Sequence, residues 1–199
     1  MKKTKALVLT SGGLDSILAA VVLKKQGIDV TALSFKGYFF NEEKAITMTN
    51  KLGINLEVVD FSKEHLDLIK KPKYGYGSAM NPCIDCHLMM IKKAGEIMKK
   101  EKYDIVVTGE VLGQRPMSQN REALKLIERQ SGIEGYLLRP LSAKLLDPTI
   151  PEQQDLIYRE KLLDISGRSR QIQMKLADEY GIKDYPTPAG GCLLTESIF

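Results

Sequence analysis

One short turn constrains the fold of this chain more than any other feature. Residues 6–10 (ALVLT) form a nearly continuous apolar run, typical of a strand buried on both faces of a parallel sheet, and residues 11–16 (SGGLDS) follow directly. The apolar segment 14–25 then predicts a helix that ends near Gly27. A strand, a glycine-rich turn and a helix start together favour phosphate binding, because free N–H groups and the helix dipole both point at the anion.

The residue types in this turn fit a nucleotide phosphate site. Its glycines let the backbone turn sharply and approach a phosphate closely, and its serines add hydroxyl donors. Asp15 cannot bind a phosphate directly, so its expected task is to hold Mg²⁺ or to order the loop. A tight turn without a ligand is the alternative interpretation. The expected binding residues of the turn are Ser11, Gly12, Gly13, Leu14, Asp15 and Ser16.

The rest of the chain continues the alternation of strands and helices. Further strands are expected at 30–35, 56–60 and 105–108, and further helices at 42–52, 83–100 and 118–130. This rhythm predicts a doubly wound α/β fold, with a parallel sheet covered by helices on both faces.

The remaining segments are less regular. Residues 70–82 are expected to form a long loop, and 136–152, which contain three prolines, to be extended or turning. A last helix is expected from a cap at Ser166 to Tyr180, with an apolar stripe that includes Ile172.

Length and charge set broad limits on function. The 199 residues suit a single domain over 1–199, and a net charge of +4 permits a polyanionic partner such as RNA without requiring one. No apolar run reaches the roughly 18 residues of a membrane span, and the basic start lacks the apolar core of a signal peptide. A cytoplasmic location is therefore expected.

Three cysteines form the second chemical signal. Cys83 and Cys86 have C-x-x-C spacing at the start of a predicted helix, and Cys192 lies in a Gly-rich loop near the end of the sequence. An odd count argues against a disulfide framework. Three unrelated thiols, a zinc site and an iron–sulfur cluster with one open iron remain as alternatives. His87, adjacent to Cys86, is expected to be a partly exposed helix residue rather than a fourth ligand.

The turn SGGLDS resembles the signature of the PP-loop family, the ATP pyrophosphatases. Together with the cysteine triad it resembles the iron–sulfur-dependent tRNA thiouridine synthases of that group, as do residues 108–119, 167–170 and 186–195. The resemblance implies ATP and Mg²⁺ as cofactors and adenylation of a uridine oxygen. It further implies a [4Fe–4S] cluster on Cys83, Cys86 and Cys192, which would act with Asp15 as catalytic groups, and a sulfur donor such as sulfide or a persulfide protein.

The resemblance also implies further nucleotide contacts at the ends of two strands. These are Ser34 and Phe35 after the second strand, and Thr108 and Gly109 after the later one. Gln114 and Arg115 follow the later strand and are expected to grip ATP phosphates or RNA. Arg168 and Arg170, at the expected start of the last helix, oppose its dipole, which indicates an anionic partner such as tRNA.

Thiouridine synthases usually carry a separate domain that grips tRNA, and this sequence offers none. The chain is therefore expected to use its loops, a homodimer partner, or an additional RNA-binding domain or subunit, or to be a fragment of a longer protein. Two alternatives to tRNA thiolation remain: adenylation of a small molecule, for sulfur transfer or for amide or nitrile formation, and nucleotide binding without turnover.

Overall fold

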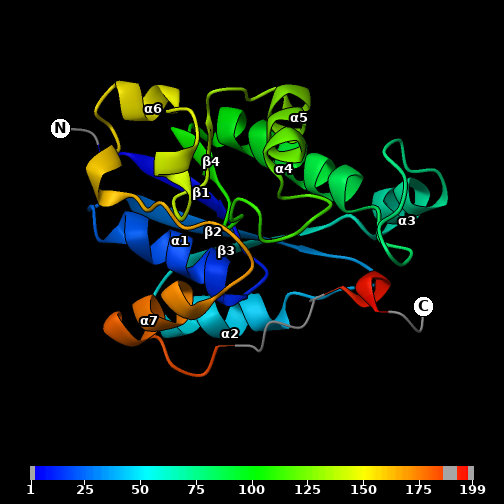
Figure 1. Cartoon of the computed structure of the whole chain (residues 1–199), viewed down its shortest axis with the longest axis horizontal. Coiled ribbons are helices and arrows are strands. Elements are labelled where there is room, and N and C mark those ends of the chain that lie inside the picture. The colour runs from blue at the N-terminus through cyan, green and yellow to red at the C-terminus, as the bar shows by residue number, and fades with distance from the viewer. Residues whose placement is uncertain (1–2, 186–191, 197–199) are drawn as a thin grey trace.

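The computed structural model, which describes residues 3–185 and 192–196, is built on a five-stranded sheet with the order β3-β2-β1-β4-β5 (Figure 1). All neighbouring strands pair in parallel. The strands are β1 (Lys5–Leu9), β2 (Asp29–Lys36), β3 (Asn55–Asp60), β4 (Ile105–Val107) and β5 (Leu137–Leu138). The doubly wound parallel sheet predicted from the alternation is confirmed, and β5 is an addition to it.

Helices cover both faces of this sheet. They are α1 (Leu14–Lys24), α2 (Glu43–Lys51), α3 (Ser62–Lys70), α4 (Cys83–Glu101), α5 (Arg121–Ser131), α6 (Ile150–Gln153) and α7 (Gln171–Glu179). Short 3₁₀ turns lie at Ala143–Leu145, Arg159–Lys161 and Leu193–Thr195. Figure 1 places α1, α2 and α7 on one side of the sheet and α4 and α5 on the other.

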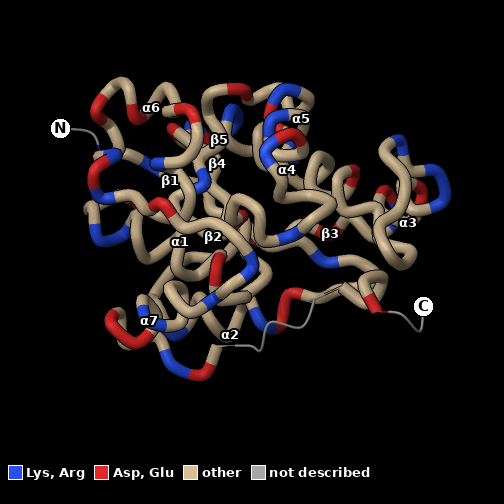
Figure 2. Tube along the Cα trace, viewed as in Figure 1, with Lys and Arg blue, Asp and Glu red and all other residues tan. Residues whose placement is uncertain are grey.

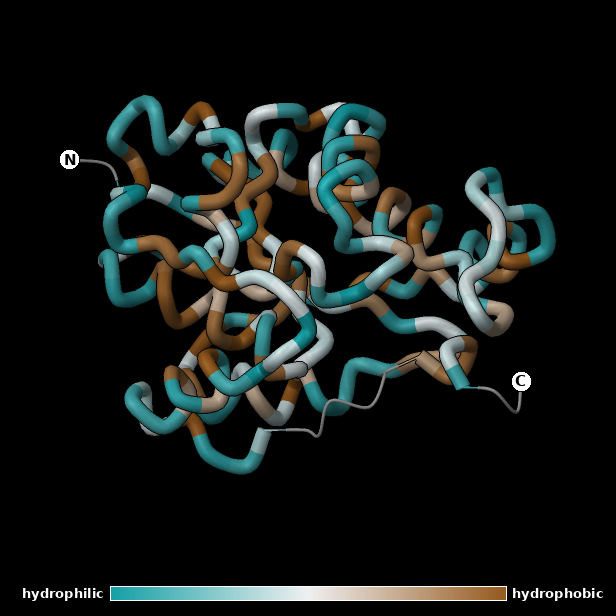
Figure 3. Tube along the Cα trace, viewed as in Figure 1, coloured by the Kyte–Doolittle hydropathy of each residue, from teal (hydrophilic) through white to brown (hydrophobic). Residues whose placement is uncertain are grey.

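Alternating side chains of β1 supply both sides of the core. Ala6 and Val8 pack with α1 residues such as Leu23, whereas Leu7 packs with α4 and α5 residues such as Ile91 and Ile127. All six are buried. Figure 3 shows the corresponding hydrophobic colouring through the centre of the molecule. The continuous apolar run in the sequence thus reflects a strand buried on both faces.

Two helical predictions are wrong in detail. The last helix begins at Gln171 rather than after Ser166, because Ser166 bridges Leu112 and the Gly167 N–H donates to the Leu112 carbonyl. Gly167 also has a φ of +85°, which a helix excludes. Ile172 is 55% exposed, so it does not belong to an apolar stripe on the core. The buried face of α7 carries Gln173 and Ala177 instead.

Other differences concern segments with weak sequence signals. Helix α3, which sequence analysis does not predict, buries only His65 and Ile69. Residues 136–152 hold β5 and α6 besides turns, and the capping box of Thr149 and Glu152 starts α6. Of the segments matched to thiouridine synthases, residues 186–191 lie outside the described part of the chain.

The order of strands creates a switch point beside β1. The chain passes from β1 to β2 and β3 on one side and then crosses to β4 on the other side of β1. Loops after β1 and β4 therefore leave the sheet in opposite directions, which opens a crevice at their carboxyl ends where open α/β sheets bind ligands. The SGGLDS turn follows β1 at this edge.

Two surface properties accompany this architecture. Lysine and arginine are interspersed with aspartate and glutamate along the tube in Figure 2, rather than gathered in one block. Within residues 3–185 and 192–196, no helix combines the length and the apolar character that a membrane crossing requires.

Candidate functional site

The SGGLDS turn holds a close backbone contact with helix α2. Gly12 has a φ of +76°, a conformation that favours glycine, and a Cβ added there would collide with the backbone of Lys44 and Ala45. Gly13 precedes the first residue of α1 in extended conformation. The turn therefore lies against α2 while the first N–H groups of α1, which have no partner within the helix, face the crevice.

A chain of hydroxyl hydrogen bonds fixes this turn from inside. The Gly12 N–H donates to Thr10 Oγ1 at 3.0 Å, Thr10 Oγ1 lies 2.9 Å from Ser16 Oγ, and Ser16 Oγ donates to the Gly13 carbonyl at 2.9 Å. Ser16 thus orders the turn in this structure, while Ser11 is exposed. Thr10 is a site residue that sequence analysis missed, because a threonine at the end of a strand looks like any other β-branched residue.

The segment after β4 closes on the same turn. A Cβ on Gly109 would collide with the backbone of Asp15 and Ser16, so only glycine allows this approach. Thr108 is buried and donates through its hydroxyl to the carboxylate of Glu110 at 3.0 Å. The structure therefore brings the predicted residues after β1 and after β4 together at the switch point.

Asp15 lies at the centre of a polar network that joins three segments of the chain. Gln114 donates from Nε2 to Asp15 Oδ2 at 2.8 Å, and Gln173 donates from Nε2 to Gln114 Oε1 at 3.2 Å. Arg170 Nη2 lies 3.8 Å from the same Asp15 oxygen. The predicted site residue Gln114 is thus placed beside the turn, and Gln173 is a second residue that sequence analysis missed.

Other predicted contact residues are either buried in the core or exposed at the surface. Ser34 and Phe35 are buried, and the Phe35 ring packs edge-on against Phe61 at 4.8 Å between centroids, so neither side chain is exposed. Arg115 and Arg168 are exposed. Leu14 is fully buried in the core, and its contribution to the turn is its backbone.

A buried ion-pair network lies next to the turn. Arg139 Nε donates to Glu110 Oε2 at 2.9 Å, and Arg139 Nη1 donates to Glu128 Oε2 at 3.0 Å. His87 Nδ1 lies 2.8 Å from Glu110 Oε1. Burial raises the pKa of Glu110, but the Arg139 charge and the His87 contact outweigh it and lower the pKa to about 2. These residues lack a motif, which is why the sequence does not reveal them.

Replacing Glu110 with glutamine is expected to lower the free energy of unfolding by about 3 kcal/mol at pH 7, because the buried Arg139 charge loses a partner. The folded pKa of Glu110 lies below its ordinary value of 4.5, so this contribution is complete above that pH and disappears as the pH falls toward 2. Urea unfolding of both proteins at pH 7, 5 and 3 measures it.

The exposed pair of Glu134 and Arg129, 3.8 Å apart, provides the control. Glu134→Gln should change the free energy of unfolding by less than about 1 kcal/mol. A Glu110→Gln deficit that stays constant from pH 5 to pH 3 would show that the ion pair is not its source.

The three cysteines converge at the amino end of α4, close to α3. Cys83 accepts a contact from Asn81 Nδ2 at 3.0 Å, and Cys86 Sγ lies 3.1 Å from Nε2 of the buried His65. Burial raises the pKa of the Cys86 thiol well above its usual range, and the nearby Cys83 and Cys192 raise it further. Two distant segments of the sequence are therefore brought into one neighbourhood by the fold.

The arrangement of side chains around the three thiols bears on whether they could hold a metal. Among the described residues, no group of three or more His, Cys, Asp or Glu side chains is arranged to hold a metal ion. Burial raises the pKa of Cys192 as well, which favours the neutral thiol when no metal is bound. The three thiols do not fit a cluster in this arrangement. His87 pairs with Glu110 and is 31% exposed, so it is the partly exposed helix residue that the sequence predicts.

Asp85, in the first turn of α4, has a structural role. Its oxygens accept the backbone N–H groups of Lys73 and Tyr74 at 3.0 and 2.9 Å, and it is buried. It thereby fixes the loop that precedes α4.

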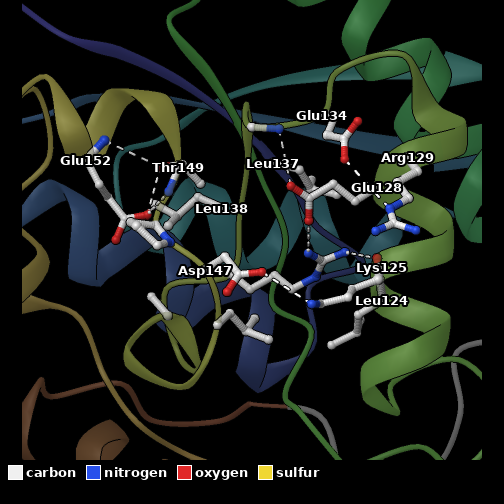
Figure 4. A pocket seen from close by; sticks show the side chains of 15 residues that line it. Leu124, Lys125, Glu128, Arg129, Glu134, Leu137, Leu138, Asp147, Thr149 and Glu152 are labelled. Atoms are coloured by element: carbon white, nitrogen blue, oxygen red, sulfur yellow. Dashed lines mark hydrogen bonds and ion pairs between the residues drawn. The ribbon is translucent and has the colours of Figure 1, made fainter.

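A separate pocket of about 210 Å³ lies between α5 and the segment that precedes α6, and no residue of the SGGLDS turn lines it (Figure 4). Most of its charged side chains are paired with one another, as Lys125 is with Asp147 at 3.4 Å and Arg139 with Glu128, and Glu152 pairs with Arg159 outside the lining. It leaves no charge free to recognise a ligand among the lining residues.

Comparison with known proteins places this site in a family context. The family model described as "Thiamine biosynthesis protein (ThiI)" matches residues 1–144. The tRNA-specific 2-thiouridylase MnmA of Methylobacillus flagellatus is 29% identical over 201 residues, which cover 90% of this chain and 54% of that protein. The chain spans about half the length of the curated relatives that it matches.

Two solved structures share the fold. A predicted subunit of tRNA methyltransferase from Methanocaldococcus jannaschii has a TM-score of 0.56 at 18% identity, covering 88% of this chain and 76% of that one. A 4-thiouridine synthetase in complex with RNA and ATP has a TM-score of 0.55 at 20% identity, covering 92% and 54%.

Proposed function

The chain belongs to the family described as thiamine biosynthesis protein (ThiI), and from that premise we propose that it catalyses ATP-dependent thiolation of a uridine in tRNA. ATP would bind on the SGGLDS turn, a uridine oxygen would be adenylated, and sulfur would then replace that oxygen. The relatives described as tRNA-specific 2-thiouridylases support the choice of substrate.

One observation carries the nucleotide part of this proposal. Asp15 lies in the first turn of α1 at the switch point, and its Oδ1 atom is buried without a hydrogen-bond partner. A carboxylate oxygen is an acceptor only, and a buried one needs a donor or a cation. Mg²⁺ fits this atom, and Asp15 would hold it. Magnesium supplies charge neutralisation for the phosphates when bound.

The reaction balances without an oxidant. The uridine carbonyl oxygen attacks the α-phosphorus, the bond to the β-phosphate oxygen breaks with its electron pair on pyrophosphate, and the N3 proton leaves. Hydrosulfide then adds its sulfur to the carbonyl carbon of the uridine. The C–O bond breaks with its electron pair on AMP, and the hydrosulfide proton goes to N3. The residues of the turn bind and orient the phosphates, so that catalysis rests on positioning and charge.

The three cysteines would take up the outer sulfur of a persulfide protein by thiol exchange. A second of these thiols would then attack the cysteine persulfide, which forms a disulfide and releases hydrosulfide, and an external thiol would reduce that disulfide; free sulfide would react directly. Their convergence from α4 and the C-terminal segment supports this role. The sequence interpretation adds a [4Fe–4S] cluster, but the described side chains do not fit one as arranged, and no step above depends on it. Iron and acid-labile sulfide content distinguishes a cluster from thiol chemistry.

The RNA would be held outside the crevice. Exposed Arg115 and Arg168 are suited to phosphate contacts, and a partner subunit, a homodimer or a further domain of a longer protein would supply the rest. Adenylation of a small molecule is the second candidate function. Dependence of pyrophosphate release on tRNA separates the two.

Replacing Cys192 with serine should abolish thiouridine formation while it leaves ATP binding within about twofold, because Cys192 lies in the cysteine neighbourhood and not at the turn. Bulk unmodified tRNA, ATP and a persulfide protein as the sulfur donor are incubated with each protein without oxygen, and nucleosides are analysed by mass spectrometry. Ser169→Ala, at an exposed position, is the control. Thiouridine formed equally by Cys192→Ser would remove the cysteines from the mechanism.

A further inference from the structure

Resting on the proposed function, we propose that Arg170 holds the pyrophosphate portion of Mg-ATP and remains bound to it as it leaves. Sequence analysis assigns Arg170 to RNA together with Arg168, but the fold gives the two side chains different surroundings. Arg168 is exposed, whereas the Arg170 side chain is 16% exposed and its guanidinium lies 3.8 Å from Asp15.

The orientation of the network follows from Asp15. A carboxylate only accepts, so Gln114 must present its amide N–H to Asp15 Oδ2, and its carbonyl oxygen must face away. Gln173 then has to donate to that oxygen, which leaves its own Oε1 pointing elsewhere. The orientations of the Gln114 and Gln173 amides therefore follow from the Asp15 carboxylate, which can only accept.

Three buried atoms of this network have no hydrogen-bond partner. Asp15 Oδ1 and Gln173 Oε1 are acceptors, and Arg170 Nε is a donor. Gln173 is fully buried. Acceptors call for a cation or its bound water, and the guanidinium donor calls for an anion. A phosphate group with a bound divalent cation satisfies the acceptors and the donor together. It does so better than an RNA phosphate alone or a water molecule would.

The position of Arg170 selects the pyrophosphate end of the nucleotide. Asp15, whose buried Oδ1 has no hydrogen-bond partner, would hold a divalent cation that neutralises the charge of the departing pyrophosphate. Arg170 approaches Asp15 from the amino end of α7, a nine-residue helix that packs on α1. When the α–β bond breaks, negative charge accumulates on pyrophosphate, and a fixed guanidinium beside it stabilises that charge.

Calorimetric titration with Mg-pyrophosphate, Mg-ATP and AMP tests this assignment in the whole chain. Arg170→Gln is expected to weaken Mg-pyrophosphate and Mg-ATP binding by about tenfold or more and AMP binding by less than twofold, since a charged hydrogen bond to phosphate is lost. Arg170→Lys should restore part of the affinity. Lys175→Gln removes the same charge from an exposed position of the same helix and should leave all three affinities unchanged.

The outcomes separate this inference from the function on which it rests. Equal pyrophosphate affinity in wild type and Arg170→Gln overturns the assignment and leaves tRNA thiolation untouched. Equal losses for AMP and pyrophosphate overturn it too, because they indicate a disturbed fold around the turn. Absence of any ATP or pyrophosphate binding to the wild-type protein overturns both proposals.

Discussion

Replacing Gly12 with alanine is expected to lower ATP affinity by about a hundredfold or more, with pyrophosphate release lost in parallel. Gly12 has a φ of +76°, and its missing Cβ would occupy the space of the Lys44 carbonyl and the Ala45 nitrogen. These are backbone atoms of α2, and they cannot rotate away as a side chain could. The turn or the helix has to move, and the N–H groups of the turn then lose their common direction toward the phosphates.

Gly27 provides a matched control for backbone strain. Its φ is +82°, but a Cβ there would meet no atom within 4 Å. Gly27→Ala should therefore cost about 1–3 kcal/mol of stability and leave ATP affinity unchanged. Calorimetry with ATP and urea unfolding of both variants separate the two effects. Similar ATP affinity in Gly12→Ala and wild type would rule out the SGGLDS turn as the phosphate site.

Replacing Asp15 with asparagine is expected to lower the rate of pyrophosphate release by about 10²–10³-fold, comparable to the loss of a group that stabilises transition-state charge. The two side chains have the same shape, so the contact with Gln114 can persist. What disappears is the negative charge that would hold Mg²⁺ and that faces Arg170 at 3.8 Å. Steady-state pyrophosphate assays over a range of Mg²⁺ concentrations measure the effect.

The magnesium dependence distinguishes a metal role from a purely structural one. If Asp15 holds the cation, the variant should need a higher Mg²⁺ concentration to reach half of its own maximal rate. Asp29→Asn removes an exposed carboxylate at the amino end of β2, the opposite edge of the sheet, and should behave as wild type. A full rate in Asp15→Asn with an unchanged magnesium requirement would contradict the assignment.

The sequence predicts the parts of the site that local chemistry defines. The turn after β1 needs glycine and apolar flanks, and the C-x-x-C pair needs a helix start, so both are visible in a short window. The parallel sheet follows from the same local alternation. Strand β5 is only two residues long, and α3 is weakly buried. Neither has a local sequence pattern that predicts it, so only the structure reveals them.

The residues that sequence analysis missed act through distant contacts. Gln173 reaches Gln114 across 59 positions, and Arg139 reaches Glu110 across 29. A glutamine on a helix is by itself a surface residue, and an arginine after a strand is by itself a solvated charge. Only the packing of α7 on α1 turns Gln173 inward. The same packing brings Arg170 to Asp15, while Arg168 stays exposed.

The bond of ATP that the protein breaks tests the nucleotide chemistry most directly. Wild-type protein is incubated with Mg-ATP, with and without bulk tRNA and sulfide, and the products are identified by phosphorus NMR. AMP and pyrophosphate are the expected products, formed faster when tRNA is present. Release of ADP and orthophosphate, or binding of ATP with no cleavage under any of these conditions, would contradict an adenylating enzyme built on the SGGLDS turn.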